Sequence, residues 1–242
     1  PEKGAQVMSE DGVILVGVDG SPESLGAVDW AVARAARDGW RVHILCAYSL
    51  PSFTTASLDG GYAALDDTAV RSGAQAVVDE AVARAQDKDV TVTGSLETGD
   101  PAGVLVDLSG EAALAVVGTR GGGGFADRLL GTVSSALPAH AYCPTIVVPR
   151  HTEGAEYTPV RRIVVGVDGS ESARKALRWA VREAEAWEAE LTAIAAVPMA
   201  SGAGALAWLP AAVDREQVLA DVRSGLDRAV ADAVEGHPKV VV

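Results

Sequence analysis

The segment with the clearest chemical potential is a glycine-rich stretch that follows an apolar run. It reads Gly118-Thr119-Arg120-Gly121, then nine residues, then Gly131-Thr132-Val133-Ser134. In a loop that leads from a strand into a helix, backbone N–H groups of the loop and of the helix N-terminus can converge on an anion. Glycine permits a close approach because it has no Cβ, and hydroxyl groups add donors. The spacing therefore predicts a phosphate loop, with a flexible connection that binds nothing as the alternative.

Asp19 is the candidate carboxylate for this chemistry, because it ends the apolar run Val13–Val18 and precedes Gly20 and Ser21. It can face the phosphates, and it can also help to cap the helix that starts after Ser21; the two roles are compatible. No Ser-His-Asp set and no pair of acids accompanies it, so no catalytic residue is predicted and binding is favoured over hydrolysis. The histidines have no metal-ligand spacing, so the metal ligands stay unassigned.

The elements that must position these residues occur twice in the chain. The run Ile14-Leu15-Val16-Gly17-Val18-Asp19-Gly20-Ser21 returns 149 residues later as Ile163-Val164-Val165-Gly166-Val167-Asp168-Gly169-Ser170. At the same offset, a helix-spaced apolar stripe around Trp30 returns around Trp179. A strand, a turn and a helix face that agree in one register indicate a duplication.

Each repeat alternates strands with helices, which predicts a doubly wound α/β domain with a parallel sheet. In the first repeat we expect strands at 13–18, 42–48, 90–95, 113–118 and 145–148, with helices that begin at Pro22, at Asp66 or Asp67, at Pro101 and at Thr132. In the second we expect strands at 163–167, 191–197 and 239–242, with helices that begin near Glu171 and Asp214.

The domain boundaries follow from this repeat. A complete domain spans 1–149, a polar linker 150–162 and a second domain 163–242. The equivalents of Asp100 to Pro149 would fall after Val242, so we expect the second domain to be incomplete, with an open strand edge.

The phosphate-loop pattern, the turn at Asp19 and the closing run Tyr142–Pro149 together resemble the ATP-binding subgroup of the universal stress protein family, over the whole chain. The resemblance implies tandem domains with strand order 3-2-1-4-5, of the adenine nucleotide alpha hydrolase-like type, and a nucleotide at the crevice between the first and fourth strands. It also implies the surroundings of the nucleotide. These are Gly17, Val18 and Asp19 beside the adenosine, Ala47 at the adenine, Val117, Gly118, Arg120 and Gly121 near ribose and phosphates, and Gly131, Thr132, Val133 and Ser134 at the phosphates.

For function, the resemblance implies an adenine nucleotide (ATP, ADP or AMP) with Mg2+, bound by a dimeric, cytoplasmic regulator of stress or growth. A slow ATPase or a nucleotidyl-transfer enzyme on the same scaffold is the alternative. A phospho-acceptor receiver domain is disfavoured because the last strand, Thr145–Val148, contains no lysine. A dinucleotide-binding domain is disfavoured because the first strand is not followed by three spaced glycines.

Composition and charge argue against several other partners. Acidic residues number 33 against 20 basic ones, a net charge of -13, and no basic stripe is present, so nucleic acid binding is not expected. The uncharged stretch 191–213 is interrupted by prolines and glycines, which favours a strand and a loop over a membrane span. The polar start Pro1–Gly12 does not read as a signal peptide. Cys46 and Cys143 are expected to be reduced, buried thiols.

Overall fold

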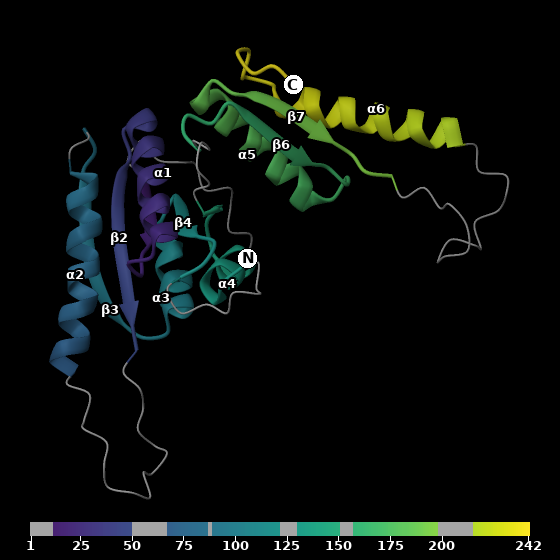
Figure 1. The fold of residues 1–242 in the computed structure, drawn as a ribbon. Helices are drawn as coiled ribbons and strands as arrows, with labels where there is room; N and C mark the ends of the chain where they lie inside the picture. The colour runs from purple at the N-terminus through teal and green to yellow at the C-terminus, as the bar shows by residue number, and fades with distance from the viewer. Residues whose placement is uncertain (1–11, 50–66, 87–88, 122–129, 151–156, 198–214) are drawn as a thin grey trace, which may run out of the picture. The chain divides into compact units, whose positions relative to one another are not determined.

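The computed structural model describes residues 12–49, 67–86, 89–121, 130–150, 157–197 and 215–242 (Figure 1). They belong to two compact units, 1–157 and 158–242. Over the described residues, the first unit contains a five-stranded sheet and the second a two-stranded sheet. No helix in this part of the chain combines the length and apolar character needed to cross a membrane.

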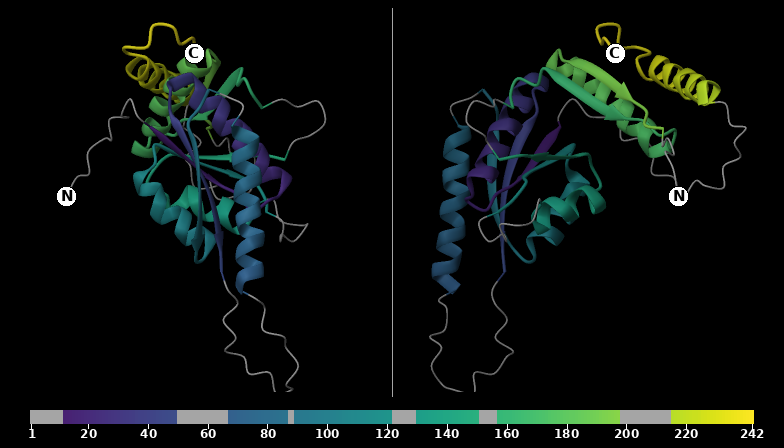
Figure 2. Two further views of the ribbon diagram at one scale, coloured as in Figure 1. Left: turned by 90° about the vertical axis from the view of Figure 1, so that its left-hand side faces the viewer. Right: turned by 45° about the vertical axis from the view of Figure 1, so that its right-hand side comes forward.

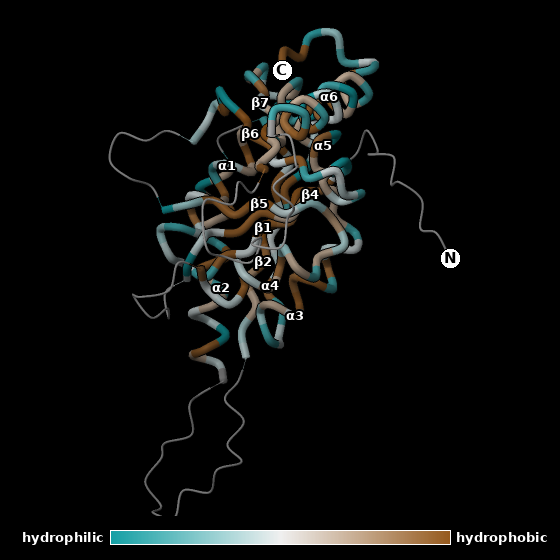
Figure 3. The backbone as a smooth tube through the Cα atoms, turned by 90° about the vertical axis from the view of Figure 1, so that its right-hand side faces the viewer, coloured by the Kyte–Doolittle hydropathy of each residue, from teal (hydrophilic) through white to brown (hydrophobic). Residues whose placement is uncertain are grey.

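The sheet of the first unit is parallel, with strand order β3-β2-β1-β4-β5, which confirms the predicted order. Its strands are β1 (Val13–Gly17), β2 (Arg41–Tyr48), β3 (Val92–Thr98), β4 (Leu114–Gly118) and β5 (Thr145–Val148). The central strands are rich in hydrophobic residues, drawn in brown in Figure 3, because helices cover both of their faces. The edge strand β3 starts two residues later than predicted and runs on to Thr98. Its alternating Thr93, Ser95 and Glu97 weaken the apolar signal that marks a buried strand.

Two pairs of helices cover the sheet (Figures 1 and 2). On one face lie α1 (Pro22–Asp38) and α2 (Asp67–Ala85), and on the other α3 (Pro101–Leu108), which runs into a 3-10 turn at Ser109–Glu111, and α4 (Thr132–His140). The second face is sealed where Leu105 of α3 and Leu137 of α4 pack with Leu15 and Leu45 of the sheet. These contacts hold α3 and α4 against this face of the sheet.

Helix α1 starts and stops as its sequence predicts. Ser21 is the N-cap, and its hydroxyl accepts the Ser24 N–H at 3.2 Å, while Pro22 occupies the first turn, where its missing N–H costs nothing. At the other end Gly39 takes a left-handed conformation (φ 68°) and donates its N–H to Ala35 O.

The second unit contains β6 (Arg162–Gly166), α5 (Glu171–Trp187), β7 (Glu190–Ile194) and α6 (Arg215–Ala233). Strands β6 and β7 pair in parallel, with the register that β1 and β2 have in the first unit. Leu177 and Val181 of α5 pack with Val165 and Leu191 of the strands, and Leu226 of α6 joins this core.

The predicted strand at 239–242 was wrong. After α6 the chain turns through Gly236 (φ 88°) and Pro238, and Val240 N–H donates to His237 O at 3.1 Å, so the backbone is still turning there. A single bond of 3.2 Å, from Leu191 N–H to Val241 O, ties the last residues to β7, which is too little to form a ladder. The strand predicted at 191–197 is also shorter, because β7 ends at Ile194.

Candidate nucleotide-binding site

A cavity of about 400 Å3 lies at the carboxyl ends of β1 and β4. Strand β2 lies on one side of β1 and β4 on the other, so the order of the strands changes direction at this point. This is the position where a doubly wound sheet binds ligands. All of the predicted site residues line it: Gly17, Val18, Asp19, Ala47, Val117, Gly118, Arg120, Gly121, Gly131, Thr132, Val133 and Ser134. The structure therefore brings together residues from four separate segments, while their contact with a nucleotide stays a prediction.

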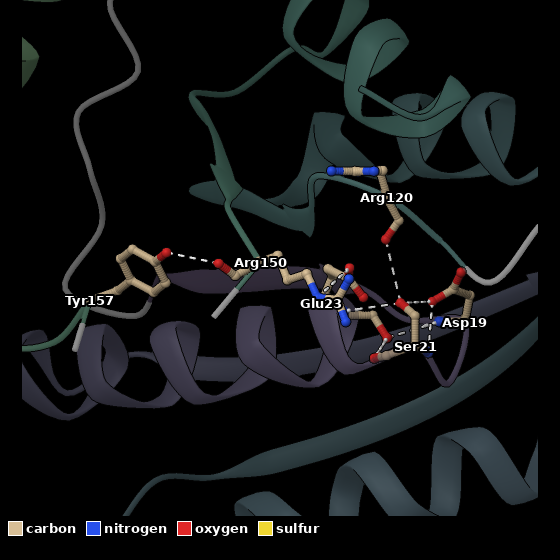
Figure 4. A network of polar contacts seen from close by, with 7 residues as sticks. Asp19, Ser21, Glu23, Arg120, Arg150 and Tyr157 are labelled. Atoms are coloured by element: carbon tan, nitrogen blue, oxygen red, sulfur yellow. Dashed lines mark hydrogen bonds and ion pairs between the residues drawn. The ribbon is translucent and has the colours of Figure 1, made fainter. Parts of the chain in front are cut away.

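Asp19 organises the turn that joins β1 to α1 (Figure 4). Its Oδ1 accepts the N–H of Ser21 at 3.1 Å and the hydroxyl of Ser21 at 2.6 Å, and this holds Ser21 in place as the N-cap of α1. The second unit repeats the arrangement without a phosphate loop among its described residues: Ser170 N–H donates to Asp168 Oδ1 at 2.9 Å. Hydrogen bonds from Ser170 lower the pKa of the exposed Asp168 carboxyl. The conserved geometry of the two repeats shows that this aspartate serves the turn, whatever else it does.

Two glycines of the loop lie in close contact with α1 or with the turn that precedes it. A Cβ on Gly121 would overlap Asp19 Oδ2, and a Cβ on Gly118 would lie 2.7 Å from the carbonyl carbon of Glu23 in the first turn of α1. Gly131 is different, because the nearest atoms to a Cβ there are 3.6 Å away, an ordinary contact. Two of the three motif glycines thus keep the loop against α1 and the Asp19 turn, a reason that the spacing of the motif did not reveal.

The two ends of the loop are pinned to each other. Gly131 N–H donates to Thr119 O at 2.8 Å and lies 2.9 Å from the Ser134 hydroxyl oxygen, while that hydroxyl donates to Thr119 O at 2.7 Å. Ser134 therefore braces the loop from a buried position. The middle of the motif, 122–129, lies outside the described residues. At the start of α4, the N–H groups of Thr132 and Val133 precede the intrahelical ladder, and both residues line the cavity.

Arg120 supplies positive charge to the cavity wall. Its carbonyl oxygen lies 3.4 Å from the Ser21 hydroxyl, which ties the loop backbone to the Asp19 turn (Figure 4). Its Nε is buried and has no hydrogen-bond partner among the described residues. A buried guanidinium nitrogen normally has a partner, so this one is suited to an anionic ligand.

The apolar half of the cavity was missed at the sequence level. Leu45 precedes Ala47 by two positions on β2 and so points to the same face, while Pro101 and Leu105 come from α3. A Cβ on Gly17 would lie 2.8 Å from Leu105 Cδ1, so α3 packs directly on the end of β1. The alternation on β2 could have identified Leu45, but Leu105 required knowledge of how α3 packs on the sheet. Ser24 and Leu130 complete the lining.

The histidine and acidic side chains do not gather as metal ligands: no cluster of three or more such groups occurs in the described part of the chain. His43 lies between two hydroxyls on neighbouring strands, with Nδ1 2.8 Å from Thr93 Oγ1 and Nε2 2.9 Å from Ser95 Oγ. Burial lowers the pKa of His43, and the nearby charge of Glu97 partly opposes this. His43 is therefore a neutral, hydrogen-bonded residue of the sheet near neutral pH.

Both cysteines are free thiols, Cys46 buried and Cys143 partly buried. Burial raises the pKa of Cys143 to about 11, although backbone hydrogen bonds act in the other direction. Because the thiolate is the reactive form, we expect iodoacetamide to modify Cys143 slowly at pH 8 and faster as the pH rises towards 11. Rates measured by mass spectrometry on the Cys46→Ser variant, against the urea-unfolded protein, check this. Equal rates for folded and unfolded protein at pH 8 would contradict it.

The parallel 3-2-1-4-5 sheet with a cavity at its switch point defines the chain as a doubly wound α/β protein. The sequence profile of the universal stress protein family matches residues 12–149 and again 159–242. A universal stress protein of Mycobacterium tuberculosis is 31% identical over 226 residues, which cover 88% of this chain and 73% of that protein. The chain belongs to the universal stress protein family.

Solved structures of other universal stress proteins are similar to the chain. A universal stress protein from Archaeoglobus fulgidus has a TM-score of 0.61 at 19% identity, and the match covers 90% of this chain and 74% of that one. This match supports the doubly wound α/β fold. A universal stress protein solved in complex with cAMP is 28% identical, with a TM-score of 0.45 over 59% of this chain and all of the other.

Proposed function

We propose that the first unit binds one adenine nucleotide, with the base at β2 and α3 and the phosphates at the start of α4. The observation that carries this proposal is the buried Arg120 Nε without a partner, in the same cavity wall as the N-terminus of α4. A guanidinium and free helix N–H groups both favour a negative charge. The cavity volume of about 400 Å3 also falls within the range of small-ligand pockets.

The other end of the cavity is suited to a flat, weakly polar base. Leu45, Ala47 and Leu105 present aliphatic surface there, and the small side chain of Ala47 leaves room above the end of β2. The ends of the cavity therefore differ in character, apolar at α3 and electropositive at α4. A nucleotide has the same asymmetry, with an aromatic base at one end and anionic phosphates at the other.

A magnesium ion would accompany the phosphates, because it binds through phosphate oxygens and one or two carboxylates. Asp19 is the carboxylate of this cavity, and its Oδ2 faces Gly121 in the loop. Bound there, the ion would offset the charge of the phosphates beside Asp19. The chain itself supplies the other contacts. The α4 N-terminus and Arg120 orient the phosphate end, and the aliphatic side chains at the other end exclude water from the base.

The biological role that we propose is regulation of stress or growth. The protein would be a cytoplasmic dimer whose activity as a regulator depends on the adenine nucleotide that it binds. Slow ATP hydrolysis remains the second candidate, but the carboxylate in the cavity, Asp19, already accepts two hydrogen bonds from Ser21. These two hydrogen bonds engage Oδ1 in the turn that caps α1. Binding is therefore preferred over turnover.

Isothermal titration calorimetry with ATP and Mg2+ is expected to give one site per chain, because the cavity is built from β4 and α4 elements that have no counterpart among the described residues of the second unit. Mass spectrometry of small molecules released from the purified protein would identify the nucleotide carried from the cell. Two equivalent sites per chain, or no binding of any adenine nucleotide by nucleotide-free protein, would overturn the proposal.

A further inference from the structure

The side chains that line the cavity are divided by element. Among the described lining residues, β2 and α3 contribute aliphatic side chains only, those of Leu45, Ala47, Pro101 and Leu105. The polar side chains come from the turn after β1, from α1, from the glycine loop and from α4, and they are Asp19, Ser24, Arg120, Thr132 and Ser134. A ligand group that reaches β2 and α3 therefore meets no polar side chain of the described lining.

Leu105 is held firmly at this aliphatic end. It is 4% exposed and packs in one core cluster with Leu45 of β2 and Leu137 of α4. A Cβ on Gly17 would lie 2.8 Å from its Cδ1 and 3.4 Å from its Cδ2, so α3 packs directly on the carboxyl end of β1. Because the side chain fills the space beside Gly17, packing fixes this part of the cavity wall, and a ligand must fit the aliphatic surface of Leu105 as it stands.

The base of a purine nucleotide reaches this end with one particular edge. Given the proposed function, on which this inference rests, the base lies at β2 and α3 and the phosphates lie at the start of α4. The sugar is attached to the five-membered ring of a purine, so the six-membered ring is the part of the base farthest from the phosphates. Adenine has a C–H group at C2 of that ring, whereas guanine has an amino group there. The two bases therefore differ in polarity at the place where the lining offers aliphatic surface.

We propose that Leu105 is a specificity-determining residue, which makes the cavity select purine nucleotides with an apolar C2 position and reject those with an amino group there. A 2-amino group against Leu105 loses its hydrogen bonds to water and gains no partner from the side chains of β2 and α3. A C–H group at C2 loses no hydrogen bond on burial. The cavity therefore takes adenine nucleotides and excludes guanine nucleotides, and the aliphatic wall is the physical reason.

The test compares three monophosphates on the whole chain by calorimetry: AMP, 2-amino-AMP and 2-methyl-AMP. The phosphate is the same in each, and the methyl group has nearly the size of the amino group without its polarity. We expect 2-amino-AMP to bind about tenfold to a hundredfold more weakly than 2-methyl-AMP, which is the usual range for one polar group placed in an apolar pocket. GMP, which also has the 2-amino group, should bind at least as weakly as 2-amino-AMP.

Substitutions at Leu105 test the assignment to this residue. Leu105→Asn keeps the volume nearly constant and places an amide oxygen at the wall, so 2-amino-AMP and 2-methyl-AMP should bind about equally. Leu105→Met keeps an apolar wall and should keep the wild-type preference. Leu108→Asn places the same amide on α3 at a half-buried position outside the cavity lining, and is the matched control. Thermal melting verifies the fold, and Leu105→Ser, with a smaller polar side chain, replaces Leu105→Asn if that variant unfolds.

The failure of this proposal differs from the failure of the proposed function. If the wild type binds AMP and 2-amino-AMP equally well, Leu105 does not select the base, and the nucleotide site itself stands. If 2-methyl-AMP binds as weakly as 2-amino-AMP, size and not polarity excludes the substituent, and the proposal is wrong. A folded Leu105→Asn or Leu105→Ser variant that keeps the wild-type preference overturns the assignment to Leu105. If the wild type binds none of the three monophosphates, the proposed function fails and the selection by Leu105 fails with it.

Discussion

Valine at both Gly121 and Gly131 is expected to abolish nucleotide binding while the secondary structure survives. At Gly121 a side chain would overlap Asp19 Oδ2, and at Gly131 the larger valine would extend into the place where phosphate oxygens meet the start of α4. We expect ATP affinity to fall at least about a hundredfold, or about 2.7 kcal/mol. Calorimetry measures the affinity and circular dichroism the fold.

Single alanine variants at Gly121 and Gly131 show how much each glycine contributes to the loss of ATP affinity. Gly121→Ala is expected to weaken ATP binding much more than Gly131→Ala, because the Cβ at 131 has ordinary contacts only. Gly26→Ala in α1, where a Cβ meets nothing within 4 Å, is the matched control and should bind normally. Unchanged ATP affinity in the double valine variant would remove the phosphate-loop assignment.

The parts of the site that could be predicted from the sequence are those that a short motif encodes. A strand that ends in Asp-Gly-Ser and a glycine loop that opens a helix each fix local backbone geometry, so their placement follows once the strand order is known. The internal repeat strengthened the prediction of the turn after β1, because Ser21 and Ser170 both cap a helix in the same way. The order of the sheet brings β1 and β4 together, and the cavity is a consequence of that order.

The parts that could not be predicted depend on packing between distant segments. Leu105 lines the cavity because α3 lies against Gly17, and no spacing in the sequence indicates that contact. The hydroxyl of Ser134 donates to Thr119 O and braces the loop, which depends on how the two loop ends approach each other, while its contact with phosphate stays a prediction. The strand predicted at 239–242 had suitable residues, but the turn at His237 to Val240 prevents it from forming a ladder. Apolar residues alone do not make a strand without a neighbour to pair with.

Substitution of Arg120 by glutamine tests the charge at the phosphate end of the cavity. The variant keeps a long polar side chain but loses the positive charge and the geometry of the guanidinium. Hydrogen bonds to charged groups contribute about 1.5–3 kcal/mol, so we expect ATP affinity to fall by roughly tenfold to a hundredfold. Adenosine has no phosphate and should bind the variant and the wild type equally.

The matched control is Arg150→Gln. Arg150 is an exposed arginine whose Nε lies 3.7 Å from Glu23 Oε1, and it does not line the cavity (Figure 4). Its replacement should leave ATP affinity unchanged, because Arg150 is exposed and its long ion pair with Glu23 lies outside the cavity. Titrations of ATP, AMP and adenosine at two salt concentrations then separate charge from packing. If Arg120→Gln weakens adenosine as much as ATP, the side chain supports the cavity wall and does not contact phosphate. If the variant binds ATP more weakly and adenosine as well as the wild type does, the Arg120 side chain contacts the phosphates.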